Sequence, residues 1–138
     1  MPEEHSNEAR FIRFYTGVMN DKDYRLIDEL VAPHVVSHDP FPGQAPGLQG
    51  LKQTIAMFHE AFPDLHVDAR VVVAGDDLVA AQFQVSGTHQ GAFMGQPATG
   101  NAIAYAEAVT VRFRDGMIVE HWAVADVTGL MEAISPPR

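Results

Sequence analysis

Four side chains could carry out acid/base chemistry: Asp39, Glu107, His121 and Tyr15. Asp39 ends an apolar segment directly before a proline, and Glu107 interrupts the otherwise apolar stretch 102–111. A carboxyl group on the inner face of a strand loses hydration, which raises its pKa and suits it to proton transfer. As a base, Asp39 could remove a proton next to a carbonyl group while Tyr15 or His121 stabilises the enolate. Glu107 would then be a second acid/base.

Each carboxylate also has an interpretation without catalysis. An Asp before a proline is often a turn former that bonds its own backbone, and Glu107 could face solvent, contact a partner subunit or form a buried pair. Two histidines are weaker candidates. Side chains alternate along a strand, so His38 points away from Asp39 and is expected at the surface or at a subunit interface. His89, in a Gly-Thr-His turn, either lines the mouth of a pocket or bonds backbone groups of its glycine-rich connection.

The segments that must position these groups are helices first and strands afterwards. Apolar side chains recur at helical spacing over residues 4–20, 24–31 and 48–62, which predicts three helices. Between the last two, residues 40–50 contain three prolines and three glycines and predict a loop. Alternating or β-branched apolar residues predict five strands, at 35–39, 65–74, 78–85, 102–113 and 117–127.

This order indicates one α+β domain over residues 1–138. We expect three N-terminal helices packed in a strongly curved, mostly antiparallel sheet, which forms a cone with an internal pocket. The last hairpin decides which side chains enter the cone. A three-residue turn at 114–116 pairs Phe113 with Met117 and puts Glu107 and His121 on one face. A two-residue Asp-Gly turn instead puts Trp122 and Asp126 beside Glu107, because a slip of one residue exchanges the two faces.

Composition excludes several classes of function. The 138 residues include no cysteine, and 9 Lys and Arg against 18 Asp and Glu give a net charge of −9. Nucleic acids and anionic membranes require clustered basic residues, and a chain without cysteine has no disulfide, thiolate metal site or cysteine nucleophile. With no membrane-length apolar run and an acidic start, we expect a cytoplasmic protein. No histidine pair has metal-ligand spacing and no glycine pattern fits a phosphate loop, so neither a metal nor another cofactor is expected.

Several segments together are similar to one family. They are VSHDP at 36–40, GTHQG at 87–91, FMGQPATG at 93–100 and FRDGMIVEHW at 113–122, followed by Asp126. In this order they resemble the SnoaL-like polyketide cyclases, within the cone-shaped superfamily that includes nuclear transport factor and ketosteroid isomerase. The resemblance implies the cone fold, aldol ring closure without a cofactor, and a homodimer with Trp122 in its interface. It also favours the register that places His121 inside.

The resemblance covers the family's active site only in part. The family's histidine in the last strand falls on His121, but its acid/base Asp falls on Ala123 and its second His on Val109. Its Asn at the end of the first strand falls on Asp39, which with the following proline is similar to the general base of ketosteroid isomerase. Tyr15 lies where that isomerase carries its oxyanion-stabilising Tyr.

The leading hypothesis is therefore a cofactor-independent enzyme that transfers protons on a polyketide-like or cyclic carbonyl compound. We predict a flat, apolar, oxygenated ligand in a pocket lined by Phe58, Phe62, His89, Tyr105, Ala123 and Val109. Two alternatives remain open. One is a hydrolase or hydroxylase-type relative that activates water, and the other is a binding domain without catalysis, favoured by the loss of the family's acid/base pair.

Overall fold

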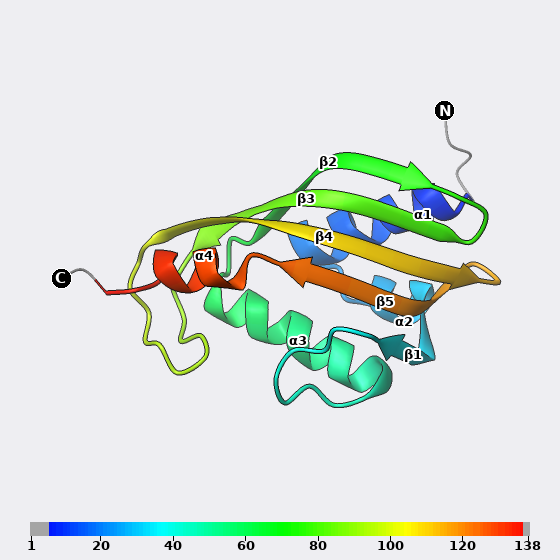
Figure 1. Cartoon of the computed structure of the whole chain (residues 1–138). Helices are drawn as coiled ribbons and strands as arrows, with labels where there is room; N and C mark the ends of the chain where they lie inside the picture. Colours follow the sequence, from blue (N-terminus) through cyan, green and yellow to red (C-terminus); the bar gives the residue numbers. More distant parts are fainter. Residues whose placement is uncertain (1–5, 137–138) are drawn as a thin grey trace.

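A five-stranded sheet curves around the helices in the computed structural model, which describes residues 6–136 (Figure 1). The strands follow the order β1-β5-β4-β3-β2, with β1 parallel to β5 and the other neighbours antiparallel. Their bounds are Val31–Ser37 (β1), His66–Ala74 (β2), Leu78–Thr88 (β3), Ala102–Arg114 (β4) and Met117–Ala125 (β5). The expected α+β cone is confirmed, with the sheet unclosed.

Four α-helices and one π-helical segment lie within the described residues. They are α1 (Asn7–Phe14), the π-helix η1 (Tyr15–Asn20), α2 (Arg25–Leu30), α3 (Gly47–Ala61) and α4 (Val127–Ala133). The three predicted N-terminal helices are present, the first as α1 continued by η1, although residues 4 and 5 lie outside the described residues. The side chain of Asn20 ties the end of η1 to β2 by bonding both the N–H and the C=O of Val67, at 2.7 and 3.1 Å.

Two of the differences from the predicted boundaries lie on the neighbouring strands β5 and β1. The predicted strand 117–127 ends at Ala125, and the unpredicted helix α4 follows, with the carboxylate of Asp126 accepting from the N–H of Gly129 at 2.9 Å. Seven residues are too few to separate helical from strand periodicity, so only this cap signals the helix. Strand β1 begins at Val31, earlier than predicted, and runs through Pro33, which an edge strand tolerates.

The turn between β4 and β5 differs from the predicted one, yet the predicted face is correct. Arg114 pairs with Met117 around a two-residue turn in which Asp115 and Gly116 have φ angles of 53° and 79°, as a type I′ turn requires. The register then shifts between Arg112 and Phe113, because β5 contains one extra residue, Val119. This β-bulge restores the expected alternation, so that the inner positions of β4 and β5 again share one face.

The core lies between the concave side of the sheet and the helices. Its most deeply buried large side chains include Phe11, Val18, Ile27, Phe62 and Phe93. Helices α1 and η1 cover β2 and β3, while α3 lies beside β1 and α4 lies against β4. Among residues 6–136, no helix has the length and apolar character needed to cross a membrane.

Candidate active site

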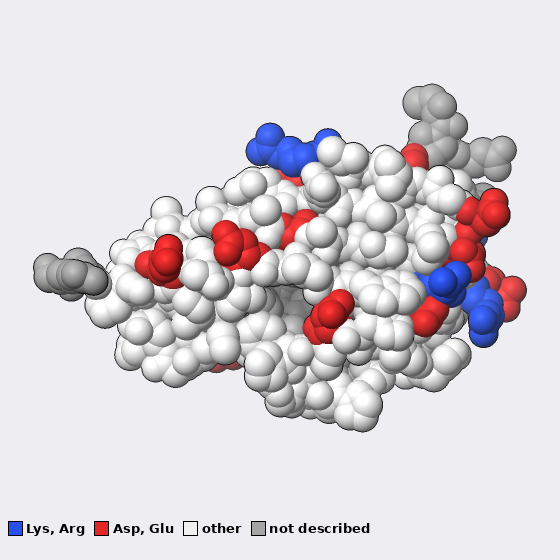
Figure 2. Space-filling model, in the orientation of Figure 1, with Lys and Arg blue, Asp and Glu red and all other residues white. Residues whose placement is uncertain are grey.

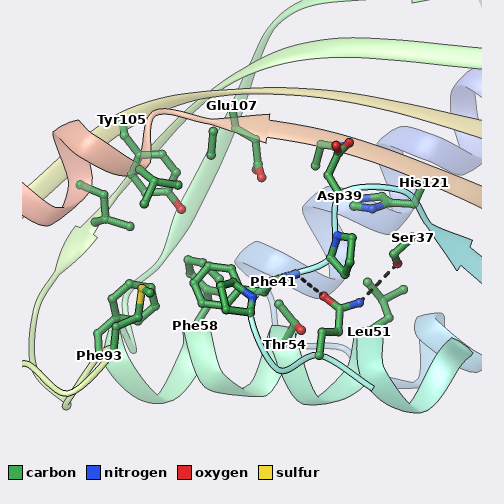
Figure 3. A pocket seen from close by; sticks show the side chains of 18 residues that line it. Ser37, Asp39, Phe41, Leu51, Thr54, Phe58, Phe93, Tyr105, Glu107 and His121 are labelled. Atoms are coloured by element: carbon green, nitrogen blue, oxygen red, sulfur yellow. Dashed lines mark hydrogen bonds between the residues drawn. The ribbon is translucent and has the colours of Figure 1, made fainter. Parts of the chain in front are cut away.

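A cavity opens between α3 and the inner face of β4 and β5 (Figure 3). An outer chamber of about 320 Å³ adjoins an inner chamber of about 100 Å³, and both are lined by Leu51, Thr54, Phe58, Tyr105, Glu107 and His121. The 37–44 loop, the 93–94 loop and α4 complete the outer wall. Figure 2 shows a hollow between the sheet and α3, and the Lys and Arg side chains visible on that face lie away from it. The mouth therefore has no basic character on this face.

Glu107 presents its carboxyl group to the cavity from the inner face of β4. Its partner on β5 is Ala125, whose small side chain leaves space in front of the carboxyl group. Burial raises the pKa of Glu107 from 4.5 to about 7. Among the described residues, none donates a hydrogen bond to this carboxyl group. Glu107 is thus present in both protonation states near neutral pH, as a general acid/base must be.

His121 and Tyr15 form a hydrogen-bonded pair at the other side of the cavity. The Nε2 atom of His121 lies 3.2 Å from the hydroxyl oxygen of Tyr15. Burial lowers the pKa of His121 to about 4, against the opposing effect of the charge on Asp39. Burial, and then the charge on Glu107, raises the pKa of Tyr15 well above 10. Both members are therefore neutral at pH 7, and in either tautomer one N–H or O–H of the pair remains after their mutual bond.

Tyr15 owes its position to the first helical segment and the sheet above it. It is the first residue of the π-helix η1, and it is 7% exposed. Its ring packs against Phe11 and Phe83, with centroid distances of 4.8 Å in both cases. These contacts fix the ring so that its hydroxyl group reaches across to β5.

Asp39 lies at the mouth and is exposed. Its Oδ2 atom accepts a hydrogen bond from the backbone N–H of Ala123 at 3.1 Å, next to the bond from the His38 N–H to the His121 carbonyl oxygen at 2.8 Å. The carboxylate thus extends the pairing of β1 with β5. Asp39 thus links two strands and does not form the local turn that is common for an Asp before a proline, and its side chain also lines the outer chamber.

The predicted pocket residues divide into two groups. Phe58, Tyr105 and Ala123 line the cavity. Phe62, His89 and Val109 do not line either chamber, and the prediction that they contact a ligand disagrees with their burial in the core. Phe62 and His89 are fully buried and Val109 is 2% exposed. His89 instead bonds Thr99 through Nδ1, at 2.9 Å to the hydroxyl oxygen, which fixes the glycine-rich connection as its structural interpretation proposed.

Several lining residues were missed by the sequence reasoning. Leu51 and Thr54 precede the predicted Phe58 at helical spacing on α3, so these two were detectable from the periodicity. Gln44 and Phe93 come from loops, where no periodicity marks the residues that face a cavity. Leu130 comes from the unpredicted helix α4.

The groups outside the cavity offer no second catalytic cluster. His38 lies on the outer face of the sheet, where its Nε2 atom is 3.1 Å from the Glu120 carboxylate and its ring stacks on Trp122 with a centroid distance of 4.5 Å. Within residues 6–136, no group of three or more His, Cys, Asp or Glu side chains could hold a metal ion.

Comparisons with known proteins agree with this architecture. The family model of the SnoaL-like polyketide cyclases matches residues 9–134. IdmH from Streptomyces antibioticus, a proposed polyketide cyclase, is 30% identical, with 94% of this chain and 99% of IdmH covered and a TM-score of 0.82. AclR from Streptomyces galilaeus, a proposed hydroxylase, is 28% identical, with coverage of 93% and 94% and a TM-score of 0.81.

A third similar structure comes from Jannaschia sp. CCS1. It is a proposed SnoaL-like polyketide cyclase, 25% identical, with 96% of this chain and 93% of that chain covered and a TM-score of 0.84. No curated protein matches this chain by sequence. The family model covers nearly all of the chain, and the matched residues include every segment that carries the resemblance. The chain belongs to the SnoaL-like polyketide cyclase family.

Proposed function

We propose that this protein is a cofactor-independent enzyme that moves a proton on a small apolar carbonyl compound of polyketide type, in an aldol ring closure or an isomerisation. The observation that carries the proposal is the carboxyl group of Glu107. It faces an apolar cavity, receives no hydrogen bond from the described residues, and has a pKa raised to about 7 by burial. A buried carboxyl group kept near half-ionisation is a costly feature for a purely structural residue.

In the proposed reaction, ionised Glu107 takes a proton from the carbon next to the substrate carbonyl. The electron pair of that C–H bond becomes the enolate, which the remaining donor of the Tyr15–His121 pair stabilises. Protonated Glu107 then returns the proton. In an isomerisation it goes to another carbon, and in an aldol closure it goes to the oxygen of the attacked carbonyl after the new C–C bond forms. Glu107 thereby replaces the carboxylate that the family carries at the position of Ala123.

Asp39 has a supporting role in this proposal. One of its carboxylate oxygens is engaged by the backbone of Ala123, and its charge acts on His121 by raising the pKa of that imidazole against the effect of burial. The net charge of −9 and the acidic side chain at the mouth favour an uncharged substrate over an anionic one.

The proposal is tested by deuterium exchange at the acidic C–H positions of 2-tetralone, a bicyclic aromatic ketone, followed by NMR in D₂O. We expect the wild-type protein to accelerate exchange and Glu107→Gln to reduce this acceleration by about a hundredfold or more, as loss of a general base does. Glu60→Gln is the matched control, because Glu60 is exposed on α3, outside the cavity lining. Equal exchange by wild type and Glu107→Gln, or no acceleration with any of a panel of bicyclic ketones, would contradict the proposal.

A second candidate function follows from the similarity to AclR, which is described as a proposed hydroxylase. In that case the product would contain a new oxygen atom, whereas isomerisation and aldol closure add none. Incubation in ¹⁸O-labelled water, followed by mass spectrometry of the product, separates water activation from proton transfer. A binding domain without catalysis would leave every ketone unchanged.

We also propose that two copies of the chain associate through the outer face of the sheet. The described helices pack on the inner side, and four valines are exposed outside: Val36, Val71, Val73 and Val124, each at least 50% exposed. Their inward neighbours Val35, Val72, Ala123 and Ala125 are buried or half-buried, as alternation along the strands requires. An apolar face of this kind favours burial against a second copy.

A further inference from the structure

Most polar side chains of the cavity wall already have a hydrogen-bond partner within the protein. The Gln44 amide accepts from the N–H of Phe41 at 2.9 Å and donates to the hydroxyl oxygen of Ser37 at 3.3 Å. The hydroxyl group of Thr54 donates to the carbonyl oxygen of Gly50 at 3.0 Å. These groups hold the wall itself together and are not free to select a ligand.

The polar groups near the sheet are also engaged, with two exceptions. Tyr15 bonds His121, and Asp39 bonds the backbone of β5. Tyr105 and Glu107 are the exceptions, because no described residue lies within hydrogen-bond reach of the Tyr105 hydroxyl or the Glu107 carboxyl group. Tyr105 is only 6% exposed. Both groups are open to the cavity, so their hydrogen-bond partner comes from outside the chain, as water or as a ligand that replaces it.

The two unpartnered groups lie next to each other on one face of one strand. They are two residues apart on β4, and both line the outer and the inner chamber. Figure 3 shows the Tyr105 hydroxyl and the Glu107 carboxyl group directed into the cavity from the same strand. The charge on Glu107 also contributes to the raised pKa of Tyr105, as expected of neighbouring groups.

We propose that Tyr105 and Glu107 together bind one oxygen atom of the ligand, and that this oxygen is a carbonyl or the corresponding enol or phenol hydroxyl. The inference rests on the proposed function and names the group that its substrate presents. The Tyr105 hydroxyl donates to the ligand oxygen throughout. When Glu107 is protonated it donates to a carbonyl oxygen, and when it is ionised it accepts from a hydroxyl group.

The surroundings of this subsite select the shape of the ligand. Ala123 and Ala125 present only methyl groups beside Glu107, and Phe58 and Phe93 face the cavity from the opposite side, with their ring centroids 5.2 Å apart. The slot between aromatic rings and methyl groups suits a planar ring system. The ligand class is therefore an aromatic or fused-ring ketone, enol or phenol, bound through one oxygen.

The test compares binding of 2-naphthol with that of naphthalene, which differs only in lacking the oxygen, at pH 8 by fluorescence titration. In the wild-type protein we expect 2-naphthol to bind about tenfold more tightly. In Tyr105→Phe we expect the preference for 2-naphthol to fall severalfold but not to vanish, because ionised Glu107 still accepts from the naphthol hydroxyl group, and we expect naphthalene binding to be unchanged. Tyr24→Phe is the control for loss of a hydroxyl group, since the Tyr24 hydroxyl bonds Nδ1 of His59 and lines neither chamber.

Two results would overturn the inference. One is equal affinity of wild type for 2-naphthol and naphthalene, including the case in which neither binds. The other is a preference for 2-naphthol that is undiminished in a folded Tyr105→Phe, with folding checked by thermal unfolding. These outcomes are independent of the proposed reaction, because 2-naphthol binding needs no turnover. Loss of 2-tetralone exchange in Glu107→Gln together with an intact naphthol preference in Tyr105→Phe would support the reaction and reject the subsite.

Discussion

At position 107 a single carboxyl group combines two properties that rarely occur together. It faces a cavity that can admit a ligand, and burial holds its pKa near 7. Asp39 was the more obvious base in the sequence, because a strand-end Asp before a proline resembles a known base. In the fold, Asp39 is exposed and bonds the backbone of Ala123. In the proposed reaction Glu107 is therefore the base that the sequence predicted at Asp39, and Asp39 has only a supporting role.

The assignment of Glu107 as the base predicts the pH dependence of the reaction. A base acts only when it is ionised, so the rate of catalysed 2-tetralone exchange should rise with pH, reach half its maximum near pH 7 and level off above it. His121, with its pKa lowered to about 4, adds no step above pH 5. The measurement is the exchange rate between pH 5 and pH 9, corrected for exchange without protein. If the exchange rate is already at its plateau at pH 5, as expected for a hydrated carboxylate with a pKa near 4, Glu107 is excluded as the base.

At the scale of the element, the proposed dimer depends on the outer face of the sheet. Trp122 stacks on His38 there, and Arg112 lies over the same indole at 5.9 Å from the ring centroid while bonding Glu120 at 2.6 Å. Val36 pairs with Glu120 and Val124 lies two residues from Trp122 on β5, whereas Val71 and Val73 lie on β2 at the far edge of the same sheet. Apolar surface surrounded by satisfied ion pairs is typical of surfaces that bury against another subunit.

Val124→Asp tests this face, because Val124 is 68% exposed and its replacement disturbs no contact within the core. We expect wild type to sediment as a dimer and Val124→Asp to dissociate at concentrations at least tenfold higher, since each subunit would bury an unpaired charge. Ile12→Asp is the control, as Ile12 is an exposed apolar residue of α1, outside the sheet. Sedimentation equilibrium distinguishes the variants. A wild-type monomer, or equal dissociation of both variants, argues against the outer face.

The last hairpin illustrates which part of an element the sequence can predict. The inner positions of β4 and β5 were predicted correctly, because the resemblance to the family places its functional histidine, here His121, on the pocket side. The turn was not, since the Arg-Asp-Gly segment allows two turn lengths that differ only by one residue. The structure combines the shorter turn with a bulge at Val119, and the two deviations cancel. A bulge has no local sequence signal here, so the correct face was predicted from the resemblance and not from the turn.

For the whole molecule, the cone could be predicted from the order of helices and strands, but the cavity could not be delimited. Residues such as Phe62 and Val109 belong to the same apolar faces as Phe58 and Tyr105, and periodicity assigns all of them equally to the interior. Whether an inward side chain meets another side chain or empty space depends on packing between distant elements. Short loops and the helix α4 make these contacts.

The cavity also leaves a signature in the stability of the whole molecule. Glu107 has a folded-state pKa of about 7, above its ordinary 4.5, so the folded protein binds this proton more tightly and stability is lost as pH rises from 4.5 to 7. His121 has a folded-state pKa of about 4, below its ordinary 6.5, so the unfolded chain binds that proton more tightly and stability is gained as pH rises from 4 to 6.5. Between pH 4.5 and 6.5 the two effects oppose each other.

In a variant that lacks one of the two groups, the other should determine how stability changes with pH. Relative to wild type, Glu107→Gln should gain stability as pH rises from 4.5 to 7, by up to about 3 kcal/mol. His121→Gln should lose stability relative to wild type over pH 4 to 6.5, by a similar amount, because the gain that His121 contributes is absent. The free energy of unfolding, measured with urea at half-unit steps from pH 4.5 to 7.5, gives both differences. If the differences do not vary with pH, the two groups do not titrate inside a desolvated cavity, and the acid/base assignment of Glu107 fails with them.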